Sequence, residues 1–178
     1  MSHDDGMGIP GVRLVSGAGT RELPLDEFVL GSYETARQPE ELLGSVRLTP
    51  WPGRSFGAYV KFGIHERPAL GIAVMLTLGP DDRVIAARLS VGCVSPQPHR
   101  IEAAERALAG QPLEAIATLA DEVGALAAHA IDPVSDLHGS AEYKRHLTRV
   151  FTRRALDVAI ARAHGREPHA RYPHAIVV

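Results

Sequence analysis

Residues 140–156 constrain the fold most, because they carry the longest helical pattern in the sequence. Ser140 can cap the helix, since its hydroxyl accepts a hydrogen bond from a free N–H group of the first turn. Gly165 supplies a stop, so we predict a helix that runs to about residue 164. The predicted buried stripe comprises Tyr143, Leu147, Val150, Phe151, Val158 and Ala161. The basic residues assigned to the solvated faces are Lys144, Arg145, Arg149 and Arg153.

A period-two pattern upstream of this helix predicts antiparallel strands. Ala58, Val60 and Phe62 share one face of a strand over residues 58–64, and Tyr59 and Lys61 project from the other. The run 70–78 is almost wholly apolar, which is typical of a central strand, and residues 79–82 form a strong turn signal. Residues 83–94 return as the next strand, so we expect a three-stranded antiparallel sheet.

The order of elements places the chain in the α+β class. Further helices are predicted over residues 101–108 and 113–130, so a C-terminal three-helix layer packs on the antiparallel β-sheet. A short β-rich region precedes this domain, with a hairpin in residues 11–23, a helical turn in 25–30 and a strand in 42–48. The predicted organisation is a flexible lead (1–10), a β-rich segment (11–52), the α+β domain (53–165) and an aperiodic tail (166–178).

Charge and residue usage narrow the classes of function. The chain of 178 residues has a formal charge of -2, which argues against partners such as nucleic acid or an anionic membrane. It has neither a membrane-spanning apolar run nor the apolar core of a signal peptide in residues 1–8, so we expect a cytoplasmic protein. The single cysteine, Cys93, excludes an internal disulfide and is predicted to be a small buried side chain. The histidine spacing matches no familiar ligand motif, so no metal site is predicted.

Two segments resemble a known family. The sequences SVGCVSPQPHRIEAAERALAG (90–110) and GSAEYKRHLTRVFTRRAL (139–156) are similar to the C-terminal domain of FAD-binding (medium) subunits of molybdenum hydroxylases. These are enzymes of the carbon monoxide dehydrogenase and xanthine dehydrogenase type. Upstream, residues 19–28, 34–36 and 39–43 resemble the last part of the preceding FAD-binding domain, so the β-rich segment would be a remnant of that domain. The resemblance covers about residues 11–165.

The resemblance has consequences for the cofactor. In that family the diphosphate of FAD lies in two glycine-rich loops of the earlier half of the subunit, where backbone N–H groups neutralise the phosphates. The resemblance implies that this chain begins after both loops. We therefore expect FAD to bind only together with a partner chain, and otherwise no cofactor. The expected partners are other oxidoreductase subunits or a second copy of the chain.

Four side chains are candidates for catalysis or binding. Lys61, two residues after Tyr59, matches a lysine that lies near the isoalloxazine in some family members, where a cation stabilises a reduced flavin; an exposed strand lysine is the alternative. Arg37 replaces an apolar residue of the family pattern and either binds a carboxylate or phosphate or is a solvated loop residue. His65, beside Glu66, has the chemistry of a general base, although neighbouring strand residues point apart.

Three functional readings follow. The first is a truncated or split FAD-subunit domain in an oxidoreductase complex. The second is a cofactor-free enzyme of the cyclase or isomerase type, which binds a small molecule in the flavin-side cleft, because a fold does not fix a function. The third is a non-catalytic assembly module that uses the exposed side of its sheet. The polar residues of the cleft in the second reading are Tyr33, Arg37, Tyr59, Lys61 and His65.

Overall fold

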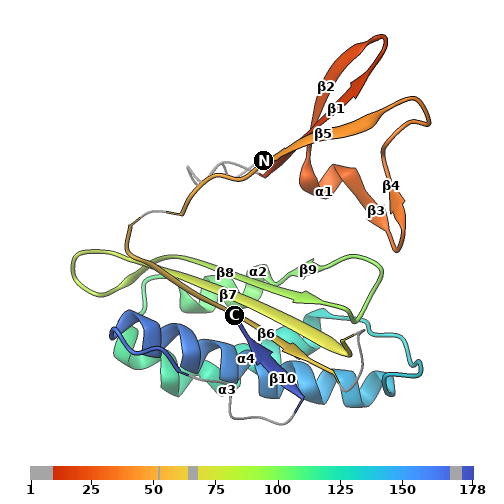
Figure 1. The fold of residues 1–178 in the computed structure, drawn as a ribbon. Helices are drawn as coiled ribbons and strands as arrows, with labels where there is room; N and C mark the ends of the chain where they lie inside the picture. The colour runs from red at the N-terminus through yellow and green to blue at the C-terminus, as the bar shows by residue number, and fades with distance from the viewer. Residues whose placement is uncertain (1–9, 52, 64–67, 169–173) are drawn as a thin grey trace. The chain divides into compact units, whose positions relative to one another are not determined.

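The structure is a computed structural model that describes residues 10–51, 53–63, 68–168 and 174–178. The chain divides into two compact units, residues 1–52 and 53–178. Figure 1 shows both units, with the first in red to orange and the second in yellow to blue. Each unit is described by itself below.

The first unit is built on a small antiparallel sheet. Its strand order is β2-β1-β5, and β3 and β4 form a separate hairpin. Val12 and Leu14 of the central strand and Phe28 of the helical turn make its buried core. The elements are β1 (Gly11–Ser16), β2 (Gly19–Pro24), α1 (Leu25–Phe28), β3 (Val29–Gly31), β4 (Glu34–Thr35) and β5 (Leu42–Arg47).

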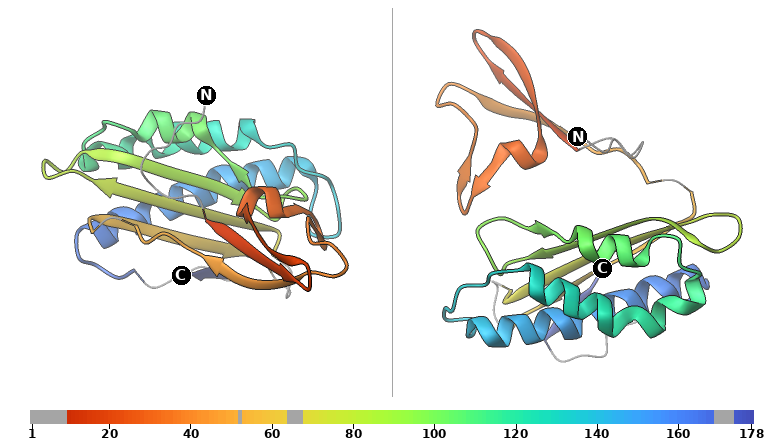
Figure 2. Two further views of the ribbon diagram at one scale, coloured as in Figure 1. Left: turned by 90° about the horizontal axis from the view of Figure 1, so that it is seen from above. Right: turned by 180° about the vertical axis from the view of Figure 1, so that it is seen from behind.

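The second unit is a five-stranded antiparallel sheet of order β10-β6-β7-β8-β9 with helices on one face. Figure 2 shows this layering, with α3 and α4 side by side beneath the sheet. The α+β class is therefore confirmed. The strands are β6 (Ser55–Phe62), β7 (Leu70–Leu78), β8 (Val84–Gly92), β9 (His99–Arg100) and β10 (Ala175–Val177). The helices are α2 (Glu102–Leu108), α3 (Leu113–Ala130) and α4 (Ala141–Ala163). None of the described helices is long and apolar enough to cross a bilayer.

The sheet is wider than the three strands expected from the sequence. β9 pairs with β8 through two residue pairs, and β10 pairs with β6 through three. Both strands are too short to show a period-two pattern, and β10 lies in the tail for which no secondary structure is predicted. The strand that carries Lys61, β6, is consequently not at the edge of the sheet, because it lies between β10 and β7.

The pattern of α4 is partly confirmed and partly wrong. Leu147, Phe151 and Val158 are buried as predicted, but Tyr143 is 44% exposed and Lys144 is 1% exposed. The Lys144 ammonium donates hydrogen bonds to the Val134 carbonyl oxygen at 2.8 Å and to Asp136 Oδ2 at 2.7 Å. A buried charge is tolerated only with such partners. The partners of Lys144 lie in the loop before α4, and a helical pattern cannot reveal them. Lys144 is therefore buried and Tyr143 exposed, the reverse of what the pattern predicts.

A second buried charge, on Glu105, stabilises the β9 edge of the sheet. The Glu105 carboxylate of α2 is 6% exposed. It accepts hydrogen bonds from the Leu89 amide at 3.1 Å and from Arg100 Nη2 at 2.7 Å, and Arg88 Nη1 lies 3.7 Å away. One carboxylate thus joins β8, β9 and α2. This contact explains how a two-residue strand keeps its place at the end of the sheet.

Candidate functional site

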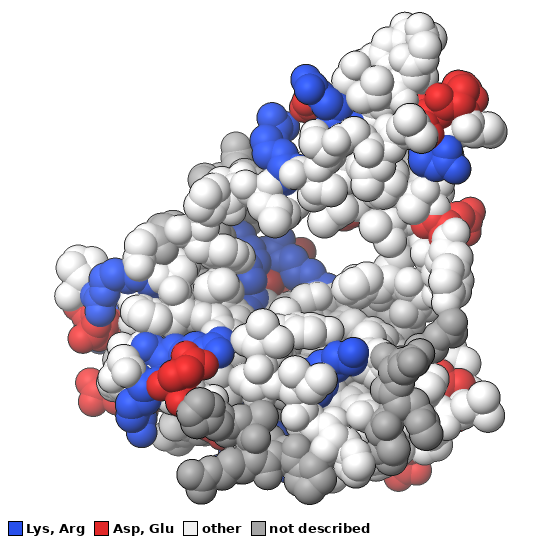
Figure 3. Space-filling model, in the orientation of Figure 1, with Lys and Arg blue, Asp and Glu red and all other residues white. Residues whose placement is uncertain are grey.

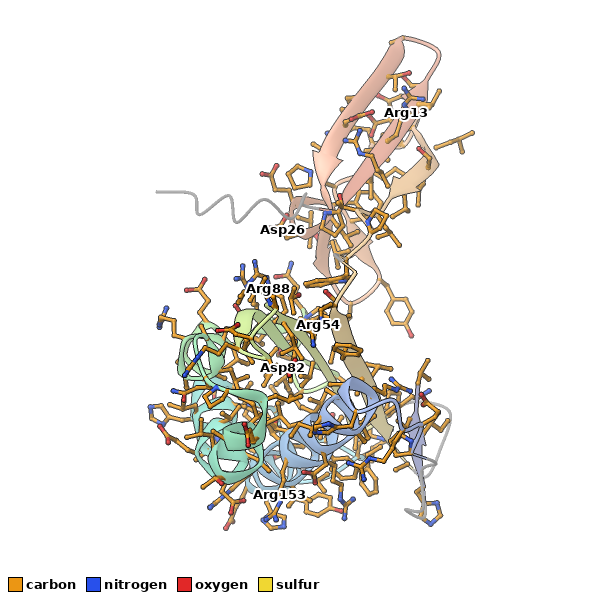
Figure 4. All side chains as sticks on the ribbon, turned by 90° about the vertical axis from the view of Figure 1, so that its left-hand side faces the viewer. Arg13, Asp26, Arg54, Asp82, Arg88 and Arg153 are labelled. Atoms are coloured by element: carbon orange, nitrogen blue, oxygen red, sulfur yellow. The ribbon has the colours of Figure 1, made fainter. Side chains whose placement is uncertain are left out.

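The face of the second unit's sheet that is turned away from the helices carries the polar candidates. Ala58 and Val60 are buried on the helix side, while Tyr59 is 40% exposed on the other side. Figure 4 shows Arg88 on the side away from the helical layer and Arg153 on the outer surface of that layer. The predicted alternation of β6 is therefore confirmed for its described residues. We call this side of the sheet the open face.

Register brings a phenol, an ammonium and two glycines together on the open face. Lys61 lies opposite Gly71, and Gly71 lies opposite Gly92 in the next strand. A Cβ atom at Gly71 would lie 2.7 Å from Tyr59 Oη, so the tyrosine ring occupies that space. At Gly92 the nearest neighbouring atom to such a Cβ is the Gly71 carbonyl oxygen at 4.0 Å, which leaves the sheet uncovered there. A glycine in a strand interior is typical of a place that another group approaches closely.

Cys93 completes this group, and its predicted burial is wrong. The residue is exposed, with a φ of 68°, at the bend that follows β8. β8 ends at Gly92, so the apolar run no longer alternates through the cysteine. Tyr59, Lys61, Gly71, Gly92 and Cys93 together are called the Tyr59–Lys61 surface from here on.

The Lys61 ammonium is the one charged group of the Tyr59–Lys61 surface as defined above. Burial raises the pKa of the Tyr59 phenol, and the nearby Cys93 adds to this shift. Desolvation of the thiol also raises the pKa of Cys93, against the opposing effect of the Lys61 charge. Both groups consequently stay protonated at neutral pH. Among the described residues, the half-buried Lys61 ammonium has neither a hydrogen-bond nor an ion-pair partner. The surface therefore offers a phenol donor, a thiol and an uncompensated cation.

The other candidates belong to the first unit or fall outside the described residues. Arg37 belongs to the first unit, where its Nη1 donates to the carbonyl oxygens of Gln38 at 3.0 Å and Glu41 at 2.8 Å. Tyr33 is 90% exposed at the turn between β3 and β4, with a φ of 61°. His65 lies outside the described residues. The structure thus brings Tyr59 and Lys61 together, and it adds Gly71, Gly92 and Cys93, which sequence reasoning missed. Glycines at facing positions of two predicted strands were the available signal.

A concave surface lies at the C-terminal end of α4, lined by residues that include Ser55, Gly57, Arg162 and Glu167. The Arg162 guanidinium in this region already has hydrogen-bond and ion-pair partners. Arg162 donates to the Gly57 carbonyl oxygen at 2.6 Å and forms an ion pair with Glu167 at 2.6 Å. These bonds fasten the end of α4 to β6, so we assign this region a structural role.

The described residues were also compared with the arrangements that bind metal ions or polyanions. Within the described ranges, no group of three or more His, Cys, Asp and Glu side chains is arranged to hold a metal ion. Figure 3 shows basic and acidic side chains interspersed over the visible face. Such mixing differs from the basic surfaces that bind nucleic acid.

Sequence comparison shows which known proteins this chain is similar to. Residues 65–159 match the family described as the CO dehydrogenase flavoprotein C-terminal domain. The carbon monoxide dehydrogenase medium chain of Afipia carboxidovorans is 34% identical over 82% of this chain and 50% of its own length. The xanthine dehydrogenase FAD-binding subunit of Escherichia coli O157:H7 is 25% identical over 83% of this chain and 51% of its own.

A solved structure matches as well. The reconstituted CO dehydrogenase from Oligotropha carboxidovorans superposes with a TM-score of 0.76 at 30% identity, covering 86% of this chain and 53% of that one. The chain therefore spans about half the length of the relatives it matches. The match to the Afipia protein extends over 148 residues, which is longer than the second unit, so it includes part of the first.

Proposed function

The chain belongs to the CO dehydrogenase flavoprotein C-terminal domain family, and from this membership we propose that it forms the flavin-side part of an FAD-binding subunit. The subunit would serve a molybdenum hydroxylase-like oxidoreductase, and a second polypeptide would hold the diphosphate of FAD. Two relatives support this reading by their names, a CO dehydrogenase medium chain and a xanthine dehydrogenase FAD-binding subunit. Tyr59 and Lys61 are the residues that we assign to the flavin ring.

The Tyr59–Lys61 surface fits a planar ring. The space at Gly92, where any other residue would place a Cβ atom, allows a ring to lie against the backbone. The Lys61 cation, which has no partner among the described residues, stabilises negative charge on whatever lies there. The Tyr59 phenol stays protonated, because burial raises its pKa, and it can donate a hydrogen bond to a ring oxygen or nitrogen. The unpaired cation beside an open glycine is the observation that carries the proposal.

When bound, FAD would supply the electron transfer, and the chain's own residues would position the ring and tune its charge. Lys61 would favour the more negative, reduced form by its positive charge. The raised pKa of Cys93 keeps the thiol neutral, so it does not cancel that effect. The side chains of the surface therefore act through electrostatics and orientation rather than through a covalent step.

The N-termini of the two long helices do not fit the diphosphate. A helix N-terminus that binds phosphate needs free N–H groups and a close approach of the ligand. The first turn of α4 is already capped, since the Ser140 hydroxyl accepts from the Tyr143 amide at 3.1 Å. Pro112 stands before the first residue of α3, and it has no N–H group to offer. These features support a phosphate site away from α3 and α4.

The experiment is a flavin titration of the chain in the presence of the half of the Afipia carboxidovorans medium chain that it does not match. We expect a yellow complex with releasable FAD. Lys61→Ala should lower the flavin reduction potential by about 30–60 mV, or ~1.4–2.8 kcal/mol for a two-electron couple. Lys61→Arg should retain the wild-type potential, and Arg153→Ala, on the outer helical surface, is the matched control. A colourless complex would overturn the proposal in favour of the cofactor-free enzyme or the assembly module.

A further inference from the structure

The apolar face of the first unit's sheet continues onto β5 but is not covered there. Val12 lies opposite Val46, and Leu14 lies opposite Leu43, so each pair shares one face of the sheet. Val12 and Leu14 are 1% and 0% exposed, whereas Val46 and Leu43 are 49% and 46% exposed. Phe28 and its neighbours therefore cover the apolar side chains of β1 but not those of β5.

The two edges of this sheet differ in character. β2 has the sequence GTRELP, whose charges and terminal proline are typical of an edge that remains in water. β5 has the sequence LLGSVR, and each of its residues is exposed. Leu42 and Leu48, at and just beyond its ends, are 74% and 69% exposed. An edge strand with this pattern is a template for a further strand.

The first unit also lacks a core large enough for its size. Three buried apolar side chains form the centre of its described part. Sheets of three strands need a well-covered apolar face to be stable alone. Within the described residues, β5 forms strand pairs with β1 only. No described strand therefore occupies the second edge of β5, where backbone groups can pair with an added strand.

We infer that the free edge of β5 is the docking site for the second polypeptide of the proposed function, on which this inference rests. That polypeptide adds a strand beside β5, and the apolar side chains on one face of the added strand cover Leu43 and Val46. The lengths of this chain and of its relative support a second polypeptide as the partner of β5. This chain matches 50% of the Afipia medium chain, and the match extends into the first unit, so that relative carries about as much further sequence, which this chain does not match. Main-chain pairing gives affinity in this mode, and the alternating side chains give specificity.

Hydrogen exchange tests the inference directly. The full chain is mixed with the unmatched half of the Afipia medium chain, and amide exchange is followed by mass spectrometry. Exchange in β5 should slow at least about tenfold on mixing, with β2 unchanged. Val46→Lys should weaken association at least about tenfold, and Thr20→Lys, on the β2 edge, should leave it intact. Because Val46 is already half exposed, the variant is expected to fold, and unaltered exchange in β1 confirms this.

Three outcomes of this experiment contradict the inference. Absence of association, or association without slowing in β5, overturns it. Protection of β5 in a dimer of the chain alone assigns the edge to a second copy and overturns it too. Flavin colour is recorded separately from exchange. A colourless complex with protected β5 removes the proposed function and leaves the docking site, whereas a yellow complex with unprotected β5 does the reverse.

Discussion

The two units differ in how completely each buries its own apolar surface. The second unit packs a large cluster between its sheet and helices, including Leu76, Leu89 and Leu156, each 0% exposed. The first unit encloses three apolar residues and leaves Leu42 and Leu43 in contact with water. Burial supplies most of the stabilisation in folding. We therefore expect the second unit to be the more stable of the two by itself, and the first unit to gain stability from the partner inferred above.

Buried charges, by contrast, occur in both units. The second unit encloses Lys144 and Glu105, which are 1% and 6% exposed. In the first unit Glu41 is 8% exposed, and its carboxylate accepts hydrogen bonds from Arg21 Nε at 2.6 Å and Nη2 at 2.8 Å. In each unit the buried charge has a partner of opposite sign, so the units differ in apolar burial and not in how they pair a buried charge.

The largest effect is expected from Leu147→Asp in α4. A charge placed at this 6% exposed position should destabilise the second unit by at least about 4 kcal/mol. Denaturant titration measures the loss, with the exposed neighbour substitution His146→Asp as the control. If hydrogen exchange in β1 rises together with that in β7, the units are not independent and the comparison fails.

Asp136→Asn should have the next largest effect. The substitution leaves the Lys144 ammonium buried without a carboxylate, and we expect a loss of about 1.5–3 kcal/mol. Asp132→Asn is the control, because its ion pair with Arg145 lies at the surface, where Asp132 is 98% exposed. Equal losses in the two variants would contradict the difference between interior and surface pairs.

This pair also predicts a pH dependence. The hydrogen bond from Lys144 lowers the pKa of Asp136 below its ordinary value of 3.8. Its contribution is therefore complete above the unfolded pKa and is lost as the pH falls through the lower, folded pKa. The stability difference between the wild type and Asp136→Asn should shrink below about pH 4.

Glu41→Gln sharpens the comparison from the side of the first unit. Hydrogen bonds from Arg21, followed by that from the Gln38 amide, lower the pKa of Glu41 from 4.5 to about 2. We expect faster exchange in β1 and β5 at neutral pH and no change in β7. The advantage of the wild type should fade as the pH falls from 4.5 towards 2. Glu22→Gln, at the 49% exposed ion pair with Arg47, is the control, and an equal effect there would contradict the prediction.

The smallest effect is expected from Lys61→Ala. The side chain is half-buried on the open face and has no partner in the described part of the chain, so stability should change by less than about 0.5 kcal/mol. Thermal melting measures the change, with Arg153→Ala as a surface reference. A large loss of stability would show that Lys61 has a structural role. The open face could then not be treated as separate from the core.

Sequence periodicity was informative wherever one face of an element is buried against another. The α+β order, the three long strands and the positions of Leu147 and Phe151 all follow from such patterns. Periodicity failed where a tertiary contact determines burial, because no local pattern predicts the ion pair between Asp136 and Lys144. The short strands β9 and β10 were missed since two or three residues carry no period. At the candidate site, Tyr59 and Lys61 could be identified from one strand, whereas Gly92 and Cys93 required the register of two further strands.

The anchoring of Lys144 has a consequence for proteolysis. Leu137 is 103% exposed at the tip of the loop before α4, and such a position ordinarily invites cleavage. Opening the loop, however, would withdraw the Val134 carbonyl oxygen and the Asp136 carboxylate from the ammonium together. Opening of the loop should therefore be slowed by the loss of these hydrogen bonds, and we expect cleavage at Leu137 to be faster in Asp136→Asn than in the wild type.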